Sequence, residues 1–322
     1  MKKFELTDEF ITDIFGNKLF RIKALVDFGT IRAGELGGFA EKEENLSNDG
    51  NAWVYGNAWV SGNARVYGDA RVYGNARVYG NAEVSGNAEV SGNAEVSGNA
   101  RVYGNAEVYG NAQVYGDARV SGNAQVYGDA EVYGDARVYG NARVYGNAEV
   151  SGNAEVSGDA RVSGNAQVYG DAEVYGNARV YGDAEVYGNA EVSGNAEVSG
   201  NARVYGDARV YGNARVYGDA EVYGNVEVSG NAEVSGNARV YGNADYAVIE
   251  GFGRYFRATT FFRCNDKTLR VQCGCFYGDL AQFREIVKKT HGDSKYAKEY
   301  LAIADLMELH FSDEEGRQEA AE

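Results

Sequence analysis

The fold is decided by the stretch RVYGDARVYGNARVYGNAEVSGNAEVSGNAEVS, which runs from Arg65 to Ser97. It repeats a six-residue unit, Gly-Asn/Asp-Ala-x-Val-Tyr/Ser, in which x is Arg in three copies and Glu in the next three. The unit continues from Gly50 to Tyr241, which makes 32 consecutive copies without an insertion or deletion. One copy departs at an apolar position, with Val226 in place of Ala. Such a strict period indicates a repeat architecture.

Each unit predicts one short strand followed by one corner. Side chains alternate between the two faces of a strand, so Ala and Val point one way while x and Tyr or Ser point the other. Gly adopts any backbone region without a Cβ penalty, and Asn and Asp tolerate the left-handed region better than other residues. Gly with Asn or Asp therefore forms the corner, and Val and Ala form a narrow, dry interior. A disordered chain lacks such an inward apolar face.

In this repeat the chain resembles the hexapeptide-repeat, left-handed parallel β-helix superfamily. That family uses units of the form aliphatic-x-x-x-small-x, and here Val66 and Val72 match the aliphatic position while Ala70 and Ala76 match the small one. The resemblance covers the whole array and therefore more than half of the chain. It implies an all-β solenoid of triangular coils, with three hexapeptides per coil and therefore about eleven coils from 32 copies.

Two further patterns favour a coil of three hexapeptides. In every third copy from Tyr67 to Ser229, Tyr and Ser alternate without a miss at ten outer positions. Among charged x residues that are three hexapeptides apart, 13 neighbouring pairs have opposite sign and 8 have like sign. Opposite charges on adjacent strands are favourable. The opening stretch therefore predicts three inter-coil ion pairs, each worth under ~1 kcal/mol at a surface: Arg65–Glu83, Arg71–Glu89 and Arg77–Glu95.

The flanks predict caps, which a solenoid needs because an uncovered edge recruits other chains. Residues 1–49 are predicted as a strand or hairpin cap with a turn at Gly16-Asn17, ending in a degenerate first coil over 32–49. In that coil Leu36 and Ala40 precede Val54 and Ala52 by three and two hexapeptides. The β-helix follows over 50–244, a small α+β module over 245–312 and a flexible acidic tail over 313–322.

Within the C-terminal module, strands are expected over 246–252, 254–263 and 268–277, with a turn at Asn265-Asp266. Two helices are predicted, one capped by Asp279 and running to about His291, the other starting at Ser294. Their expected apolar faces are Leu280, Phe283 and Val287 on the first, and Tyr296, Tyr300, Ala304, Met307 and Phe311 on the second. The flanks are similar to those around Gly-Asn-Ala-x-Val arrays in proteins of gut bacteria and their phages, a resemblance that implies either a bacterial protein or one encoded by a phage or prophage.

Composition limits the class of protein. The chain of 322 residues has a net charge of −16, 44 Gly and no Pro. This charge disfavours direct binding to nucleic acid or to anionic membranes. No apolar run approaches the ~18 residues of a membrane span. Three Cys, all in the last quarter, predict reduced thiols and a cytoplasmic protein.

Catalytic chemistry is not expected. Enzymes of the family that the array resembles are acyltransferases that use a His on the coil and insertions that build a donor site. The array has no His, no Cys and no insertion, so we predict no enzyme and no cofactor, with acyltransferase as the lower alternative. His291 is interpreted as a helix-end residue and His310 as a partly buried surface residue. Cys264, Cys273 and Cys275 with His291 form a weak zinc pattern, so no metal is predicted and buried thiols are the default.

The Tyr residues are the candidate binding surface. Of the 32 outer positions 20 are Tyr, and in one column five of them follow one another in consecutive coils. Tyr, Trp and Arg are enriched at protein interfaces, although stacked aromatic residues also stabilise sheets by themselves. The predicted binding residues are Tyr169, Tyr187, Tyr205, Tyr223, Tyr241, Arg203, Arg239, Trp53 and Trp59.

The predicted function is a non-enzymatic scaffold, a rigid solenoid that presents Tyr, Arg and Glu ladders to a protein partner or to itself. A dimer or trimer is expected, through a Tyr-rich face or through the C-terminal module. The alternative is an inhibitor of a host defence or nucleic-acid enzyme that imitates DNA. It rests on the net charge of the array, −10 from 13 Arg, 14 Glu and 9 Asp, but interleaved Arg and Glu leave no purely acidic face.

Overall fold

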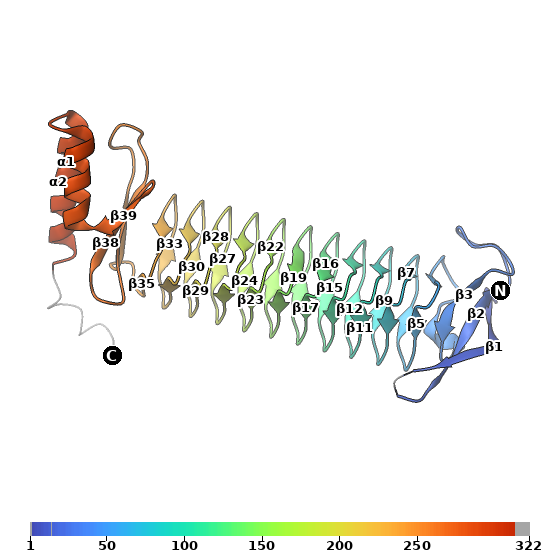
Figure 1. Cartoon of the computed structure of the whole chain (residues 1–322). Coiled ribbons are helices and arrows are strands. Elements are labelled where there is room, and N and C mark those ends of the chain that lie inside the picture. Colours follow the sequence, from blue (N-terminus) through green and yellow to red (C-terminus); the bar gives the residue numbers. More distant parts are fainter. Residues whose placement is uncertain (1, 14, 313–322) are drawn as a thin grey trace. The chain divides into compact units, whose positions relative to one another are not determined.

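The computed structural model describes residues 2–13 and 15–312, and the predicted acidic tail over 313–322 lies outside the described residues. The fold is a parallel β-solenoid of about eleven turns with a small C-terminal module of strands and helices (Figure 1). The chain divides into two compact units. We call residues 1–177 the N-terminal unit and residues 178–322 the C-terminal unit, and each is described by itself.

In both units the strands of the repeat pair in parallel with those three hexapeptides away, as the sequence predicts. In the N-terminal unit Arg71 pairs with Glu89 and Val72 with Val90, and the N–H of Tyr73 donates to the carbonyl of Val90 at 3.0 Å. Most strands contain only x and Val. They are shorter than predicted, because the chain already turns into the corner at the Tyr or Ser position.

Three sheets, which we call faces 1, 2 and 3, form the sides of the solenoid. In the N-terminal unit, face 1 contains β4 (Trp53–Val54), β7 (Arg71–Val72), β10 (Glu89–Val90), β13 (Glu107–Val108), β16 (Gln125–Gly128), β19 (Arg143–Gly146) and β22 (Arg161–Val162). Face 2 contains β5 (Trp59–Val60), β8 (Arg77–Val78), β11 (Glu95–Val96), β14 (Gln113–Val114), β17 (Glu131–Val132), β20 (Glu149–Val150) and β23 (Gln167–Val168). Face 3 contains β6 (Arg65–Val66), β9 (Glu83–Val84), β12 (Arg101–Val102), β15 (Arg119–Val120), β18 (Arg137–Val138), β21 (Glu155–Val156) and β24 (Glu173–Val174).

The C-terminal unit uses the same three columns of the sequence. Face 1 contains β25 (Arg179–Val180), β28 (Glu197–Val198), β31 (Arg215–Val216) and β34 (Glu233–Val234). Face 2 contains β26 (Glu185–Val186), β29 (Arg203–Val204), β32 (Glu221–Val222) and β35 (Arg239–Val240). Face 3 contains β27 (Glu191–Val192), β30 (Arg209–Val210) and β33 (Glu227–Val228).

The interior of each unit is the predicted stack of Val and Ala. Every repeat Val and Ala is 0% exposed, including Val226 at its Ala position. Because each coil alone has too little apolar surface to form a core, the stacking of identical coils supplies it.

At the corners, Gly and Asn have separate roles. Gly92 has a φ of +68°, and a Cβ added there would lie 2.8 Å from the carbonyl oxygen of Gly110 in the next coil. The corner Asn and Asp residues do not adopt the left-handed region, since the only described non-Gly residues with positive φ are Phe256 and Lys267. Instead the Asn amides form ladders: Asn93 donates from Nδ2 to Oδ1 of Asn111 at 3.0 Å. Their predicted conformational role is therefore wrong, and inter-coil hydrogen bonding replaces it.

The N-terminal flank forms the predicted hairpin, β1 (Phe4–Thr12) and β2 (Lys18–Ala24), followed by β3 (Leu36–Ala40) and a 3-10 helix (Glu43–Asn45). A degenerate coil is present, but its register differs from the prediction. Ala40 pairs with Val60 and Leu46 bridges Val66, so each partner lies two positions further along the chain than three hexapeptides would place it. Leu36 consequently lies outside the core and is 55% exposed.

The C-terminal module contains an antiparallel sheet of β36 (Tyr246–Ile249), β37 (Thr259–Arg263), β38 (Leu269–Cys273) and β39 (Phe276–Asp279). The expected strand over 254–263 begins only at Thr259, because residues 250–258 form a loop. Helices α1 (Leu280–His291) and α2 (Lys295–His310) lie side by side in Figure 1.

Helix α1 begins and ends as predicted, and α2 begins directly after its predicted cap, Ser294. The Asp279 side chain accepts from the N–H of Gln282 at 2.8 Å, and Gly292 ends α1 with a φ of +56°. Phe283, Val287, Tyr300, Ala304 and Met307 are buried together. Tyr296, which the apolar pattern of α2 placed in the core, is exposed instead.

Candidate functional site

The predicted Tyr ladder exists on face 2 of the C-terminal unit. The ring centroids of Tyr187 and Tyr205, and of Tyr205 and Tyr223, are 4.9 Å apart with planes within 2° of parallel. Tyr223 and Tyr241 follow at 5.8 Å and 29°. Tyr169 has the same position in its hexapeptide but belongs to the N-terminal unit. The ladder in the C-terminal unit is thus a continuous aromatic strip four rings long.

Most rings of this strip are partly buried, which affects the pKa of their hydroxyls. Tyr187, Tyr205 and Tyr223 are half-buried, whereas Tyr241 is exposed. Burial raises the pKa of Tyr187, Tyr205 and Tyr223 above the ordinary value. A Tyr hydroxyl is uncharged at neutral pH even at its ordinary pKa of ~10, so the strip combines uncharged hydroxyls with flat apolar rings.

Alternating charges line the strip. Glu185 lies opposite Arg203, Arg203 opposite Glu221, and Glu221 opposite Arg239. The Nε atom of Arg203 is 3.8 Å from Oε1 of Glu185, and that of Arg239 is 3.2 Å from Oε2 of Glu221. Both Arg side chains remain about half exposed. The arrangement is an amphipathic contact surface with balanced charge.

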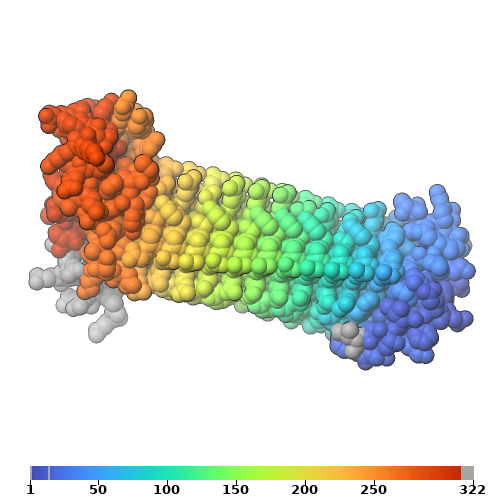
Figure 2. Space-filling view, viewed as in Figure 1, coloured from blue at the N-terminus to red at the C-terminus, as the bar shows by residue number. Residues whose placement is uncertain are grey.

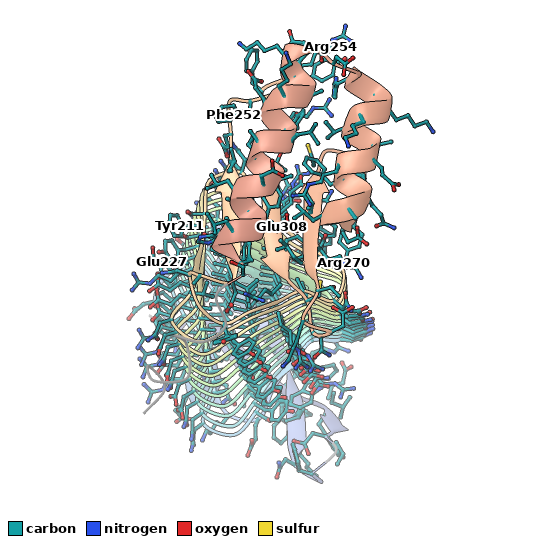
Figure 3. The ribbon with its side chains drawn as sticks, turned by 90° about the vertical axis from the view of Figure 1, so that its left-hand side faces the viewer. Tyr211, Glu227, Phe252, Arg254, Arg270 and Glu308 are labelled. Atoms are coloured by element: carbon teal, nitrogen blue, oxygen red, sulfur yellow. The ribbon has the colours of Figure 1, made fainter. Side chains whose placement is uncertain are left out.

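Elsewhere on the solenoid several Tyr hydroxyls donate to a Glu of the next coil. On face 3, Tyr139 donates to Oε2 of Glu155 at 3.0 Å, and Tyr211 donates to Oε2 of Glu227 at 3.2 Å. Figure 3 labels Tyr211 and Glu227 on this side of the solenoid. Figure 2 shows rows of outer side chains on the surface of each unit. These two hydroxyls of face 3 are therefore engaged in hydrogen bonds between neighbouring coils.

The ion pairs predicted from the opening stretch form in two of three cases. Nη1 of Arg71 is 3.3 Å from Oε1 of Glu89, and Nη1 of Arg77 is 2.9 Å from Oε1 of Glu95. Arg65 and Glu83 are in register, but Glu83 forms its ion pair with Arg101 at 3.9 Å and accepts from Tyr67.

Trp53 and Trp59 are not surface contact residues, so their predicted role is wrong. Both occupy outward x positions but are buried, with exposed fractions of 0% and 7%. Phe4 and Phe28 pack edge-on against Trp53 with centroids at 6.4 and 5.3 Å. The N-terminal hairpin covers this part of faces 1 and 2, which a hexapeptide pattern alone does not reveal.

The N-terminal cap also supplies hydrogen-bond donors to the first coil. The ammonium of Lys3 donates to the carbonyls of Gly50 and Ala52 at 3.3 and 3.0 Å. Nδ2 of Asn45 donates to the carbonyls of Gly62 and Ala64 at 3.1 and 2.9 Å. Desolvation by burial lowers the pKa of Lys3 to about 8, which nearby carboxylates only partly offset. The cap thus closes the carbonyl edge of the solenoid.

The opposite edge, in the C-terminal unit, meets hydrogen-bond acceptors. The N–H of Glu227 donates to Oδ1 of Asn243 at 2.9 Å, and the N–H of Glu233 donates to Oγ1 of Thr260 at 2.9 Å. Glu250 accepts from both the backbone and the side chain of Asn231 at 3.3 and 3.0 Å. Sequence reasoning expected caps here but did not identify these residues.

The thiols and His residues of the module do not form a metal centre. In residues 2–13 and 15–312 no group of three or more His, Cys, Asp and Glu side chains is placed to hold a metal ion. All three Cys are free thiols. The backbone of Cys264 forms an isolated antiparallel β-bridge with Ala238. The Sγ atom of Cys273 accepts a hydrogen bond from the hydroxyl of Thr259 at 3.2 Å. His291 lies beside Tyr300 with ring centroids 5.8 Å apart, and His310 is exposed.

These features define a β-solenoid repeat protein with capped backbone edges. A family model described as "YdcK Beta solenoid repeat" matches residues 58–72, 70–86, 94–110, 112–128, 124–140, 130–146 and 136–152. A second, described as "Bactofilin: Polymer-forming cytoskeletal", matches residues 160–252. Among curated proteins no sequence matches the chain. The solenoid repeat expected from the sequence is confirmed, while handedness and hexapeptide-superfamily membership stay predictions. No helix among the described residues is long and apolar enough to cross a membrane.

Proposed function

We propose that the chain is a non-enzymatic structural scaffold of the cytoplasm that associates with copies of itself through its side-chain ladders. The similarity of residues 160–252 to a polymer-forming family supports self-association. The free thiols are in keeping with a reducing compartment. The proposal assigns no catalytic residue and no cofactor.

The observation that carries the proposal is the contrast between closed edges and open faces. Lys3 and Asn45 occupy carbonyls at one edge, and Asn243, Glu250 and Thr260 occupy N–H groups at the other. A second solenoid could pair with either edge only after displacing its cap. The side faces need no such displacement, so association proceeds through them, with a dimer or trimer as the smallest assembly.

Face 2 of the C-terminal unit is the surface on which we place the contact. Its stacked rings form a rigid strip. Because folding has already ordered these side chains, binding a second copy costs little further conformational entropy. The neighbouring Glu and Arg residues alternate along the same strip. A second copy can therefore meet it with opposite charges in register.

The test is sedimentation velocity of the intact protein and of two triple variants. Tyr187→Ser, Tyr205→Ser and Tyr223→Ser together should lower the association constant at least tenfold. The control combines Tyr181→Ser, Tyr211→Ser and Tyr217→Ser, which removes the same atoms from faces 1 and 3. Ser already occupies 12 of the 32 outer positions, so both variants keep a side chain that the coil accepts. A strictly monomeric wild type at tens of micromolar would refute the proposal.

The non-enzymatic part has its own test. The intact protein is incubated with acyl-coenzyme A and cell-extract acceptors, and release of free coenzyme A is followed. No turnover above the buffer control is expected, since the array has no His to act as general base. Turnover by the purified protein would contradict this part without bearing on self-association.

A further inference from the structure

The C-terminal module contains an apolar pocket that the scaffold function does not use. It has a volume of about 210 Å³ and opens between the 250–258 loop, the turn after β38 and the second half of α1. Its inner wall includes Phe283, Val287 and Tyr300, whose exposed fractions are 2%, 4% and 7%. The sequence signal for this site is the aromatic and Arg-rich loop GFGRYFR over 251–257.

Two guanidinium groups stand at the mouth of the pocket. Arg254 and Arg257 both line it, and their Cζ atoms lie 5.5 and 5.0 Å from the ring centroid of Tyr255. Within the described ranges neither Arg has a carboxylate within ion-pair distance, unlike Arg263, Arg270 and Arg284 of the same module. Figure 3 shows Arg254 and Phe252 at the end of the helix pair remote from Glu308.

The electrostatic setting favours an anion. Residues 251–300 contain ten Lys and Arg against five Asp and Glu, a net charge of +5 in a chain whose total is −16. His291 also lines the pocket. Unpaired Arg side chains that stack on an aromatic ring keep their fork of donors free for a carboxylate or phosphate.

The loop that carries both Arg residues is held in place. The N–H of Gly253 donates to Oε2 of Glu299 on α2 at 2.9 Å. Gly253 has a φ of +73°, and a Cβ added there would lie 2.1 Å from the hydroxyl oxygen of Tyr300. Because only Gly fits, the loop packs directly on the pocket wall. Such preorganisation lowers the entropic cost of binding.

We propose that this pocket binds a small molecule with an apolar, preferably aromatic body and a single oxyanion group. The body enters between Phe283, Val287 and Tyr300, and the oxyanion meets Arg254 and Arg257 at the mouth. An apolar cavity of ~150 Å³ accommodates benzene, so a volume of about 210 Å³ is enough for a phenyl ring with one substituent. The proposal is independent of the self-association described above.

Four probes of one shape separate the contributions: benzoate, phenyl phosphate, benzyl alcohol and benzylamine. Calorimetry on the full-length protein gives their affinities. Protection of Cys275 from iodoacetamide, read by peptide mass spectrometry, locates the bound probe because this exposed thiol lines the pocket. Cys264 is buried and lies outside the pocket, so its alkylation would report unfolding of the module rather than binding of the probe. Benzoate or phenyl phosphate should bind at least tenfold more tightly than benzyl alcohol, and benzylamine more weakly still.

Two charge variants test the role of the Arg pair. Arg254→Gln with Arg257→Gln should lower the affinity for the better anion at least tenfold and leave benzyl alcohol unchanged. Lys267→Gln with Lys298→Gln removes the same charge from residues that do not line the pocket and should change affinity less than threefold. The ratio of benzoate to phenyl phosphate affinity distinguishes a carboxylate ligand from a phosphate ligand.

Three results would overturn the proposal. One is equal affinity for benzoate and benzyl alcohol, and another is an equal loss in both charge variants. The third is the absence of Cys275 protection by either anion at saturating concentration. Sedimentation of the Arg254 and Arg257 variant should match wild type, so failure here is distinguishable from failure of self-association.

Discussion

Two corner glycines test whether coil stacking, and not only backbone conformation, requires Gly in each hexapeptide. Gly92 and Gly56 have φ values of +68° and +59°. A Cβ at Gly92 would lie 2.8 and 3.0 Å from the oxygen and nitrogen of Gly110, whereas at Gly56 the nearest atom is the Gly74 oxygen at 3.8 Å. Gly56→Ala therefore adds only the strain of a left-handed Ala, and Gly92→Ala adds strain and a clash with the next coil.

The magnitudes follow from this comparison. A left-handed Ala costs about 1–2 kcal/mol, and overpacking against fixed backbone adds about 1–3 kcal/mol. Replacing Gly by Ala also lowers the entropy of the unfolded chain, which stabilises the folded state of both variants by about 0.4–1 kcal/mol. This term therefore cancels in the difference between the two variants. We expect Gly92→Ala to be less stable than Gly56→Ala by about 1–3 kcal/mol.

Hydrogen exchange is the appropriate assay, because coils of a repeat protein open locally. The N–H of Asn93 donates to the carbonyl of Gly110 at 2.7 Å, and that of Asn57 donates to Gly74 at 3.2 Å. The protection lost at each amide gives the local free energy, and urea unfolding gives the global one. If the two variants lose stability equally within about 0.5 kcal/mol, contact between stacked corners does not explain the glycines.

Three further perturbations have defined outcomes. Lys3 has a pKa of about 8 in the folded protein and 10.5 in the unfolded chain. Between these pH values the unfolded chain binds more protons, so the stability of the wild type measured by urea unfolding should rise with pH, by up to about 3 kcal/mol. Lys3→Met should abolish that rise. Burial and a hydrogen bond to Glu131 raise the pKa of Tyr115. The stability that the protonated Tyr115 hydroxyl contributes to the folded state is therefore complete below pH ~10 and is lost as the pH rises above it. Tyr115→Phe should make alkaline unfolding, followed by circular dichroism, less steep. Arg77→Gln breaks the 2.9 Å contact with Glu95 and should lower thermal stability by under ~1 kcal/mol, with the difference vanishing at about 1 M salt.

The array could be predicted from the sequence because each of its positions has a single local determinant. Alternation places Val and Ala inside, and the pairing of Arg71 with Glu89 follows from the coil of three hexapeptides. The role of Asn is the exception. Asn favours left-handed turns in isolation, but at a corner next to Gly the neighbouring coil offers an amide partner, and the Asn93–Asn111 ladder forms instead. That choice depends on a neighbour in the next coil, which local propensity does not include.

The candidate site was only partly predictable. The strip from Tyr187 to Tyr241 follows from the repeat, so its ring stacking could be expected. The burial of Trp53 and Trp59 could not, because it depends on where an irregular hairpin folds back. The pocket behind Arg254 and Arg257 likewise depends on a loop that the apolar pattern of residues 254–263 presents as a strand.

The chemistry of the two caps follows from the direction of a parallel sheet. Between stacked coils the N–H groups of one coil donate to the carbonyls of the following coil, as Tyr73 does to Val90. The first coil therefore has unpaired carbonyls, which require donors, and the last coil has unpaired N–H groups, which require acceptors. Lys3 and Asn45 are donors at the first edge, and Asn243 and Thr260 are acceptors at the last. Because the two caps are chemically opposite, they are not interchangeable, and each leaves only the side faces of its unit available to a second copy.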